Sequence, residues 1–459
     1  MPDLSAVDLL AAYAARTLSP VEVTQAVLAR IAACEPVLAA TWALDPTGAM
    51  AAARESEARW RNGAPQGALD GVPITIKENI ATRGTAIPLG TAASELVPAA
   101  ADAPPAARVR EAGAVILGKT TMPDYGMLSS GLSSFHKLAR NPWNTACNPG
   151  GSSAGAAAAA AAGYGPLHIG TDIGGSVRLP AGWCGIFALK PSAGRVPIDP
   201  PYIGRVAGPM TRSVADSALL MKVLSQPDAR DHMSLPPAEI PWQDLEIDLR
   251  GLRIGLLEHT GIGAAVEPEV AAAVQAAAHA FAGAGAAIVP MKPFLTAEML
   301  DGLDRFWRTR SLADFSTLPP ARQDRVLPFI RAWIEGARGL SGLEVYRGFN
   351  RIVEMSAASV QACQPFDFVL SPTAPMPSYR ADWPCPTNDP AKPFEHIGFT
   401  VAFNMSGQPA ASVNCGFTAG GLPIGLQIVG RRFDDIGVLR LAHAWERMRP
   451  AQLPWPVVA

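Results

Sequence analysis

The sequence predicts a layered α/β protein, because segments with strand character alternate with segments whose apolar residues recur at helical spacing. Two amphipathic helices open the chain, over residues 5–18 and 19–36, and Pro20 stands where a first helical turn tolerates proline. Three short apolar strands are predicted next, at 71–77, at 112–120 and, after an alanine-rich helix, at 165–172.

The second half of the chain repeats this alternation. A strand, a helix and a second strand are predicted at 249–259, 268–285 and 286–291. The residues from about 294 to 362 are rich in Trp, Phe, Arg and Leu, and we expect them to form a helical insertion or cap. Strand and loop return at 366–376, so we expect a single domain over residues 1–459.

The composition indicates a globular protein without a charged partner. Hydrophobic residues make up 49% of the chain, and 38 Lys and Arg are balanced by 40 Asp and Glu. This balance gives no reason to expect binding to nucleic acid or to an anionic membrane. The most apolar run, 155–163, is far shorter than the roughly twenty residues that span a bilayer. The amino terminus lacks the features of a secretory signal, so a cytoplasmic location is expected.

Cysteine and histidine show no metal-binding or disulfide pattern. The 6 cysteines and 7 histidines are dispersed, without a CxxC pair or an HExxH segment. We therefore expect reduced thiols, no metal and no cofactor.

Three serine sites compete as candidate nucleophiles. Ser153 lies in a G-x-S-x-G segment, but the residues before it lack the strand that such an elbow requires. Ser134 and Lys137 match S-x-x-K, a short pattern that arises often by chance. Ser176 follows a predicted strand and two glycines, whose backbone amides can converge on an oxyanion without side chains in the way.

Lys77 is the candidate base for such a serine. It ends an apolar strand, and burial of an ammonium group lowers its pKa, so that the amine can be neutral near pH 7. The alternative is structural, because Glu78 follows directly and could pair with Lys77.

Together these segments resemble the amidase signature family. The matching text is GVPITIK at 71–77, GKTTMPDYG at 118–126, NPWNTACNPGGSSAG at 141–155, GTDIGGSVRLPAGWCGIFALKPSAGRV at 170–196, and FNMSGQPAASV with GLPIGLQIVG near the carboxy terminus. The resemblance implies a layered α/β/α fold, in which helices flank a large central mixed sheet. The core of the signature is expected at about 65–220.

The resemblance also implies the site. Ser176 is expected to be the acylated nucleophile, Ser152 a bridging serine preceded by a cis peptide bond, and Lys77 the base. The backbone amides of Ile173, Gly174, Gly175 and Ser176 are expected to form the oxyanion hole, and Tyr125, Gly126 and Met127 to line the acyl-binding channel.

The implied reaction is hydrolysis of the C–N bond of a small-molecule amide through an acyl-enzyme. An apolar aryl or acyl amide is the first expectation, since Arg178 is the only obvious anion-binding residue near the serine. Carbamate or urea-type hydrolysis is an alternative. The amidotransferase subunit that supplies ammonia to charged transfer RNA is placed lower, because its usual GSIRQPA is here GSVRLPA. A non-catalytic scaffold disagrees with the intact triad, and a homodimer stays open.

Overall fold

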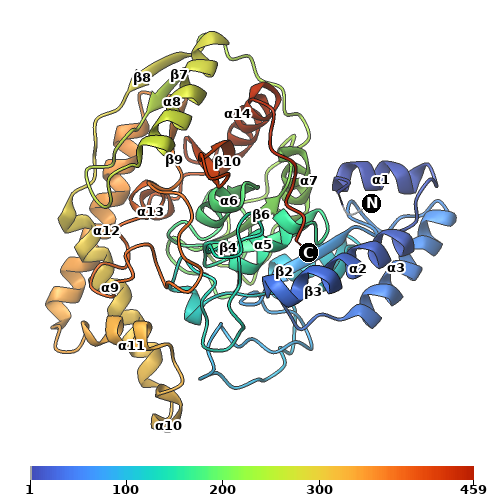
Figure 1. The fold of residues 1–459 in the computed structure, drawn as a ribbon, viewed down its shortest axis with the longest axis horizontal. Coiled ribbons are helices and arrows are strands. Elements are labelled where there is room, and N and C mark those ends of the chain that lie inside the picture. Colours follow the sequence, from blue (N-terminus) through green and yellow to red (C-terminus); the bar gives the residue numbers. More distant parts are fainter. Residues whose placement is uncertain (1–2, 459) are drawn as a thin grey trace.

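One mixed sheet of 11 strands runs through the computed structural model, which describes residues 3–458 (Figure 1). The strands lie in the order β1-β3-β2-β4-β6-β5-β10-β11-β9-β7-β8. Their bounds are β1 Thr41–Trp42, β2 Pro73–Lys77, β3 Val115–Thr120, β4 Leu167–Asp172, β5 Phe187–Lys190, β6 Val206–Thr211, β7 Arg253–Leu256, β8 Ala287–Pro290, β9 Phe368–Pro372, β10 Ala410–Phe417 and β11 Pro423–Gly430.

Parallel and antiparallel pairs are segregated within this sheet. β2 pairs in parallel with both β3 and β4, and β7 pairs in parallel with both β8 and β9. The strands between these two groups pair antiparallel. Parallel neighbours need a crossover, and the sequence provides helices where β2, β3, β4 and β7, β8 are connected.

Helices cover both faces of the sheet, which confirms the predicted α/β/α layering. Their bounds are α1 Ala6–Ala14, α2 Pro20–Leu38, α3 Pro46–Arg61, α4 Pro104–Glu111, α5 Ala154–Ala162, α6 Arg178–Cys184, α7 Val214–Leu224, α8 Pro268–Gly283, α9 Ala297–Ser316, α10 Pro320–Gln323, α11 Pro328–Glu335, α12 Gly342–Cys363, α13 Gly398–Met405 and α14 Asp435–Met448, with a 3₁₀ turn at Asp124–Gly126. Side chains of α4, α7, α8 and α14 share one apolar core with the sheet. Those of α2, α3 and α5 form another core with β3.

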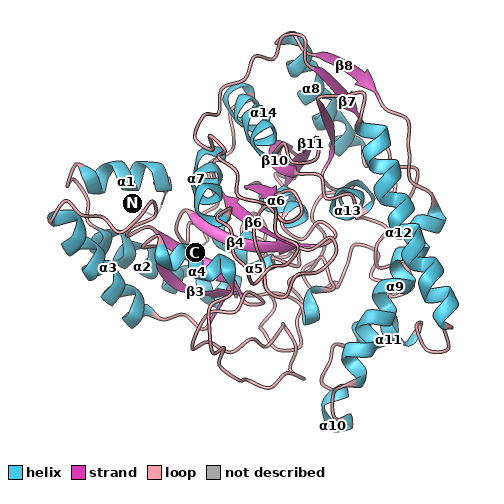
Figure 2. Cartoon of the chain, turned by 180° about the vertical axis from the view of Figure 1, so that it is seen from behind, coloured by secondary structure: helices cyan, strands magenta, loops and turns pink. Residues whose placement is uncertain are grey.

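The N-terminal helices and the helices α9–α12 lie at opposite ends of the molecule in both views (Figures 1 and 2). α2 begins with a capping box, in which Ser19 and Glu22 exchange hydrogen bonds, directly before Pro20. α9 and α12 pack along each other and bury Trp307 and Ile352. Within residues 3–458 no helix is both long and apolar enough to cross a membrane.

The start of α5 approaches neighbouring backbone closely. Gly155 donates its amide to the Thr121 carbonyl at 3.0 Å. A Cβ at Gly155 would lie 2.1 Å from the Ala40 carbonyl oxygen and 2.4 Å from the Thr121 amide nitrogen. Only glycine therefore allows this contact, which holds the chain just after Ser152 and Ser153.

We expect Gly155→Ala to lower the free energy of unfolding by about 1–3 kcal/mol, because the added methyl group forces the backbone apart. Urea denaturation measures this loss. Gly283→Ala is the matched control, since Gly283 also lies in a helix and a Cβ there has no neighbour within 4 Å. Equal stabilities for the two variants would contradict the close approach.

Candidate active site

The parallel pairing of β2 with β4 brings the predicted base to the predicted serine loop. Ile76 pairs with Ile169, so Lys77 and Asp172, the last residues of the two strands, lie at the same edge of the sheet. Ser152 and Ser153 stand at that edge as well, directly before α5, which packs on both strands. The Gly151–Ser152 peptide bond is cis, as the family resemblance implies.

Lys77 contacts the bridging serine rather than its sequence neighbour. Its Nζ lies 2.8 Å from Ser152 Oγ and 3.0 Å from Ser153 Oγ. The carboxylate of Glu78 instead contacts His136 and the Gly90 amide. The structural alternative for Lys77, an ion pair with Glu78, is therefore not formed.

Burial sets the protonation state of Lys77. The side chain is fully buried, and desolvation lowers the pKa of Lys77 from its ordinary 10.5 to about 7, with a smaller contribution from the positive charge of Arg205. The negative charges of Asp172 and Glu78 oppose this shift only in part. A substantial fraction of the amine is then neutral near pH 7 and can accept a proton.

The two competing serines are bound within the protein. Ser153 is fully buried, and its Oγ donates to the Thr171 carbonyl at 3.1 Å while it accepts from Lys77. No strand precedes it, so the elbow geometry is absent at this position. Ser134 donates to Asp124 at 2.7 Å, which leaves the S-x-x-K segment in a structural role.

The glycine loop between β4 and α6 presents Ser176 to a cavity that it shares with Ser152. Gly175 has φ +129°, and a Cβ there would lie 2.6 Å from Thr400 Oγ1, so both conformation and space require glycine. The structure corrects one predicted oxyanion donor, because the Gly175 amide donates to Asp172 Oδ1 at 2.7 Å. The amides of Ile173, Gly174 and Ser176 are the remaining candidates.

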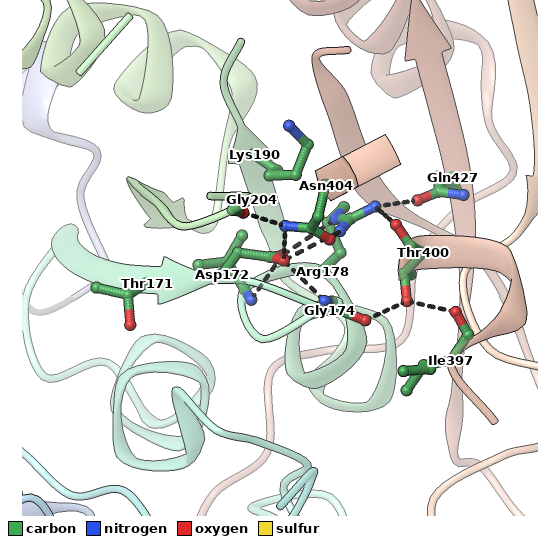
Figure 3. A network of polar contacts seen from close by, with 12 residues as sticks. Thr171, Asp172, Gly174, Arg178, Lys190, Gly204, Ile397, Thr400, Asn404 and Gln427 are labelled. Carbon is green, nitrogen blue, oxygen red and sulfur yellow. Dashed lines mark hydrogen bonds and ion pairs between the residues drawn. The ribbon is translucent and has the colours of Figure 1, made fainter. Parts of the chain in front are cut away.

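A buried ion pair holds this loop in place (Figure 3). Arg178 donates to both carboxylate oxygens of Asp172, at 3.0 and 3.1 Å, and both side chains are fully buried. Burial alone would raise the pKa of Asp172, but the charge and hydrogen bonds of Arg178 outweigh it and hold that pKa well below its ordinary value. Arg178 therefore serves the loop rather than an anionic substrate.

The remaining hydrogen bonds of the pair come from the distant C-terminal half. Gln427 accepts from Arg178 at 2.8 Å, and Asn404 donates to Asp172 at 2.8 Å. Thr400 accepts from Arg178 through its carbonyl and donates through Oγ1 to the Gly174 carbonyl at 2.6 Å. These three residues were not predicted from the sequence, although two of them lie in the quoted segments FNMSGQPAASV and GLPIGLQIVG.

The cavity in front of the serines has a volume of about 720 Å³. Tyr125, Gly126 and Met127 line it, where the sequence placed the acyl channel. Its charged lining residues were not predicted, and they are Asp199, Arg205, Arg310 and Asp314. Among residues 3–458 no group of three or more His, Cys, Asp or Glu side chains could hold a metal ion.

Comparison with known proteins places this geometry in a family. The profile of the amidase family matches residues 22–439, most of the chain. The chain belongs to the amidase family. A glutamyl-tRNA(Gln) amidotransferase subunit of Myxococcus xanthus is 36% identical over an alignment of 496 residues, which covers 97% of this amidase and 97% of the relative.

Two solved structures share the fold over nearly the whole chain. A bacterial aryl acylamidase of the amidase signature enzymes superposes with a TM-score of 0.90 at 29% identity, covering 98% of this chain and 96% of that one. The corresponding glutamyl-tRNA(Gln) amidotransferase subunit of Thermotoga maritima superposes with a TM-score of 0.78 at 25% identity, covering 100% and 98%. Both the predicted family and its fold are confirmed. The sequence relative favours the alternative of an amidotransferase subunit over the apolar-amide hydrolase that was the first expectation.

We expect Arg178→Met to lower the free energy of unfolding by about 3–5 kcal/mol, because it leaves the Asp172 carboxylate buried and unpaired. Chemical denaturation measures the loss. The double variant Asp172→Asn with Arg178→Met removes the buried charge as well, so it should recover part of the stability. A single variant as stable as the wild type would show that the pair does not hold the loop.

Proposed function

We propose that this amidase hydrolyses the C–N bond of a carboxylic amide through an acyl-enzyme on Ser176. The observation that supports this most directly is the contact of 2.8 Å between the buried Lys77 amine and Ser152. A lysine with a pKa of about 7 is a base matched to neutral pH, and histidine is then not required for the reaction.

The proton path follows from these positions. Neutral Lys77 takes the hydroxyl proton of Ser152, and Ser152 takes that of Ser176 as Ser176 Oγ attacks the amide carbonyl carbon. The carbonyl oxygen becomes an oxyanion facing the amides of Ile173, Gly174 and Ser176. Such a donor contributes about 3 kcal/mol to the stabilisation of a transition state in comparable sites.

Collapse of the tetrahedral intermediate reverses the proton path. The C–N bond breaks, and the leaving nitrogen receives the proton that Lys77 holds, through Ser152. Water then adds to the acyl-enzyme carbonyl and gives its proton to the same relay. Cleavage of the ester bond returns that proton to Ser176 Oγ, so that the products are a carboxylic acid and ammonia or an amine.

For the substrate, we infer an amide that serves as an ammonia donor, as expected of a glutamyl-tRNA(Gln) amidotransferase subunit. The support is the identity of 36% across nearly all of both chains. The second candidate is a free-standing amidase acting on an aryl or acyl amide. It is favoured by the TM-score of 0.90 with an aryl acylamidase and by Leu179, where GSIRQPA would have glutamine.

The pH dependence tests Lys77 as the base. Because only the neutral amine accepts a proton, kcat/KM should rise with pH through about 7 and become level above it. Lys77→Met should lower turnover by about 10²–10⁴-fold and abolish this rise.

Lys190→Met is the matched control for Lys77→Met. Lys190 is equally buried with a pKa of about 7, but its Nζ donates to the Pro191 carbonyl at 2.8 Å. It should keep the pH profile of the wild type. Near wild-type turnover by folded Lys77→Met would exclude Lys77 as the base.

The two substrate candidates separate in a release assay. If the chain belongs to an amidotransferase, ammonia release from L-glutamine should increase when glutamyl-tRNA(Gln) and the other components of the complex are added, while aryl amides react slowly. Faster hydrolysis of an acetanilide by the chain alone would overturn this assignment in favour of the free-standing amidase. Ser176→Ala is the blank for both substrates.

A further inference from the structure

A side pocket of about 130 Å³ adjoins the cavity in front of Ser176. The two spaces share the lining residues Leu89, Tyr125, Arg310 and Asp314. Beyond them the pocket is closed by apolar side chains of α9 and α11, among them Phe315 and Ile330. The shared residues therefore form the junction between the reaction cavity and a small closed end.

Two buried polar atoms at this junction have no partner among residues 3–458. They are the hydroxyl oxygen of Tyr125 and the Nε of Arg310. A buried donor without an acceptor costs about 1–3 kcal/mol, so such a pair in a cavity wall points to a ligand that satisfies both. Because a guanidinium only donates, that ligand must present an acceptor.

Arg310 is a cation without a counter-ion in this wall. Its Nη2 is 3.1 Å from Met127 Sδ, a weak acceptor, and its guanidinium lies 4.9 Å from the Tyr202 ring centroid. Within residues 3–458 no carboxylate lies within 4.0 Å of it. Its carrier helix α9 places it on the cavity side, whereas Arg305 on the same helix is exposed.

A second guanidinium lines the same cavity. Arg205 donates to the Pro200 carbonyl at 3.1 Å, and burial together with the positive charge of Arg310 lowers the pKa of Arg205. Two close cations that disfavour each other's charge are both stabilised by an anion bound between them. The cavity also has two acids, Asp199 and Asp314, but both side chains are exposed and are therefore screened by water.

We propose that Arg310, with Arg205 and Tyr125, binds a carboxylate carried by the acyl part of the amide substrate. A carboxylate offers two acceptor oxygens and a full charge, which match the guanidinium groups and the free hydroxyl. The substrate class is then a monoamide of a dicarboxylic acid or of an acidic amino acid, in place of the apolar acyl group expected from the sequence. This inference rests on the proposed amide hydrolysis.

The test compares each charged amide with a neutral amide of equal length. The probes are succinamate, glutaramate and adipamate, paired with butanamide, pentanamide and hexanamide. The wild type should prefer the charged member of at least one pair in kcat/KM. Arg310→Met should reduce that charged-to-neutral ratio by about 10- to 100-fold, which is the usual range for a charge-assisted hydrogen bond.

Arg305→Met is the matched control, because Arg305 is exposed and does not line the cavity. It should leave both members of each pair unchanged. Arg310→Lys keeps the charge and should recover part of the preference, which separates loss of the carboxylate contact from a general disturbance of α9. A wild type without preference, or an Arg310→Met ratio equal to that of Arg305→Met, would overturn the proposal.

Binding to a non-hydrolysing variant separates this inference from the proposed function. Calorimetry with Ser176→Ala measures the affinity for the monoamides and for glutarate without turnover. If hydrolysis occurs but Arg310→Met changes neither the ratio nor the affinity, the anion site is wrong and the reaction stands. If no amide is hydrolysed but Arg310→Met abolishes glutarate binding, the reaction is wrong and the anion site stands.

Discussion

The buried ion pair between Asp172 and Arg178 is the constraint on which the candidate site depends. Asp172 ends β4, and its carboxylate receives the amides of Gly175 and Val177 as well as Arg178. The loop that carries Ser176 is therefore folded around a carboxylate. Asn404 and Gln427 complete the hydrogen bonds of the pair, so the loop is also attached to the C-terminal half of the chain. A buried pair is tolerable only when its hydrogen bonds are satisfied in this way.

Burial alone does not select the base. Lys77, Lys119 and Lys190 are all buried, and desolvation lowers the pKa of each to about 7. Their contacts differ, because Lys119 reaches the Ile80 carbonyl and Thr82, and Lys190 reaches the Pro191 carbonyl. Only Lys77 of the three lies against a serine hydroxyl of the cavity. The chemistry therefore depends on where the neutral amine is placed.

The cavity is built from parts of the chain that are distant in sequence. The 3₁₀ turn with Tyr125 forms one wall, the loop before β6 supplies Arg205, and α9 supplies Arg310. The serine relay sits on the rigid sheet edge, while these charged walls come from a loop and from the helices at the far end of the molecule (Figures 1 and 2). Reaction and substrate selection are thus carried by different layers of the fold.

The sequence by itself determined the strands that end at the site and the identity of the family. β2, β3 and β4 lie within the predicted ranges because each is a short apolar segment bounded by turn residues, and Ser152, Ser176 and Lys77 stand in motifs of fixed spacing. Tertiary structure alone decided that Lys77 avoids Glu78, that the Gly175 amide binds Asp172, and that Arg178 pairs within the loop. It also brought Arg205 and Arg310 into one cavity. The reason is physical: local patterns set backbone conformation, whereas the partner of a buried charge is chosen by side chains that meet only after the chain has folded.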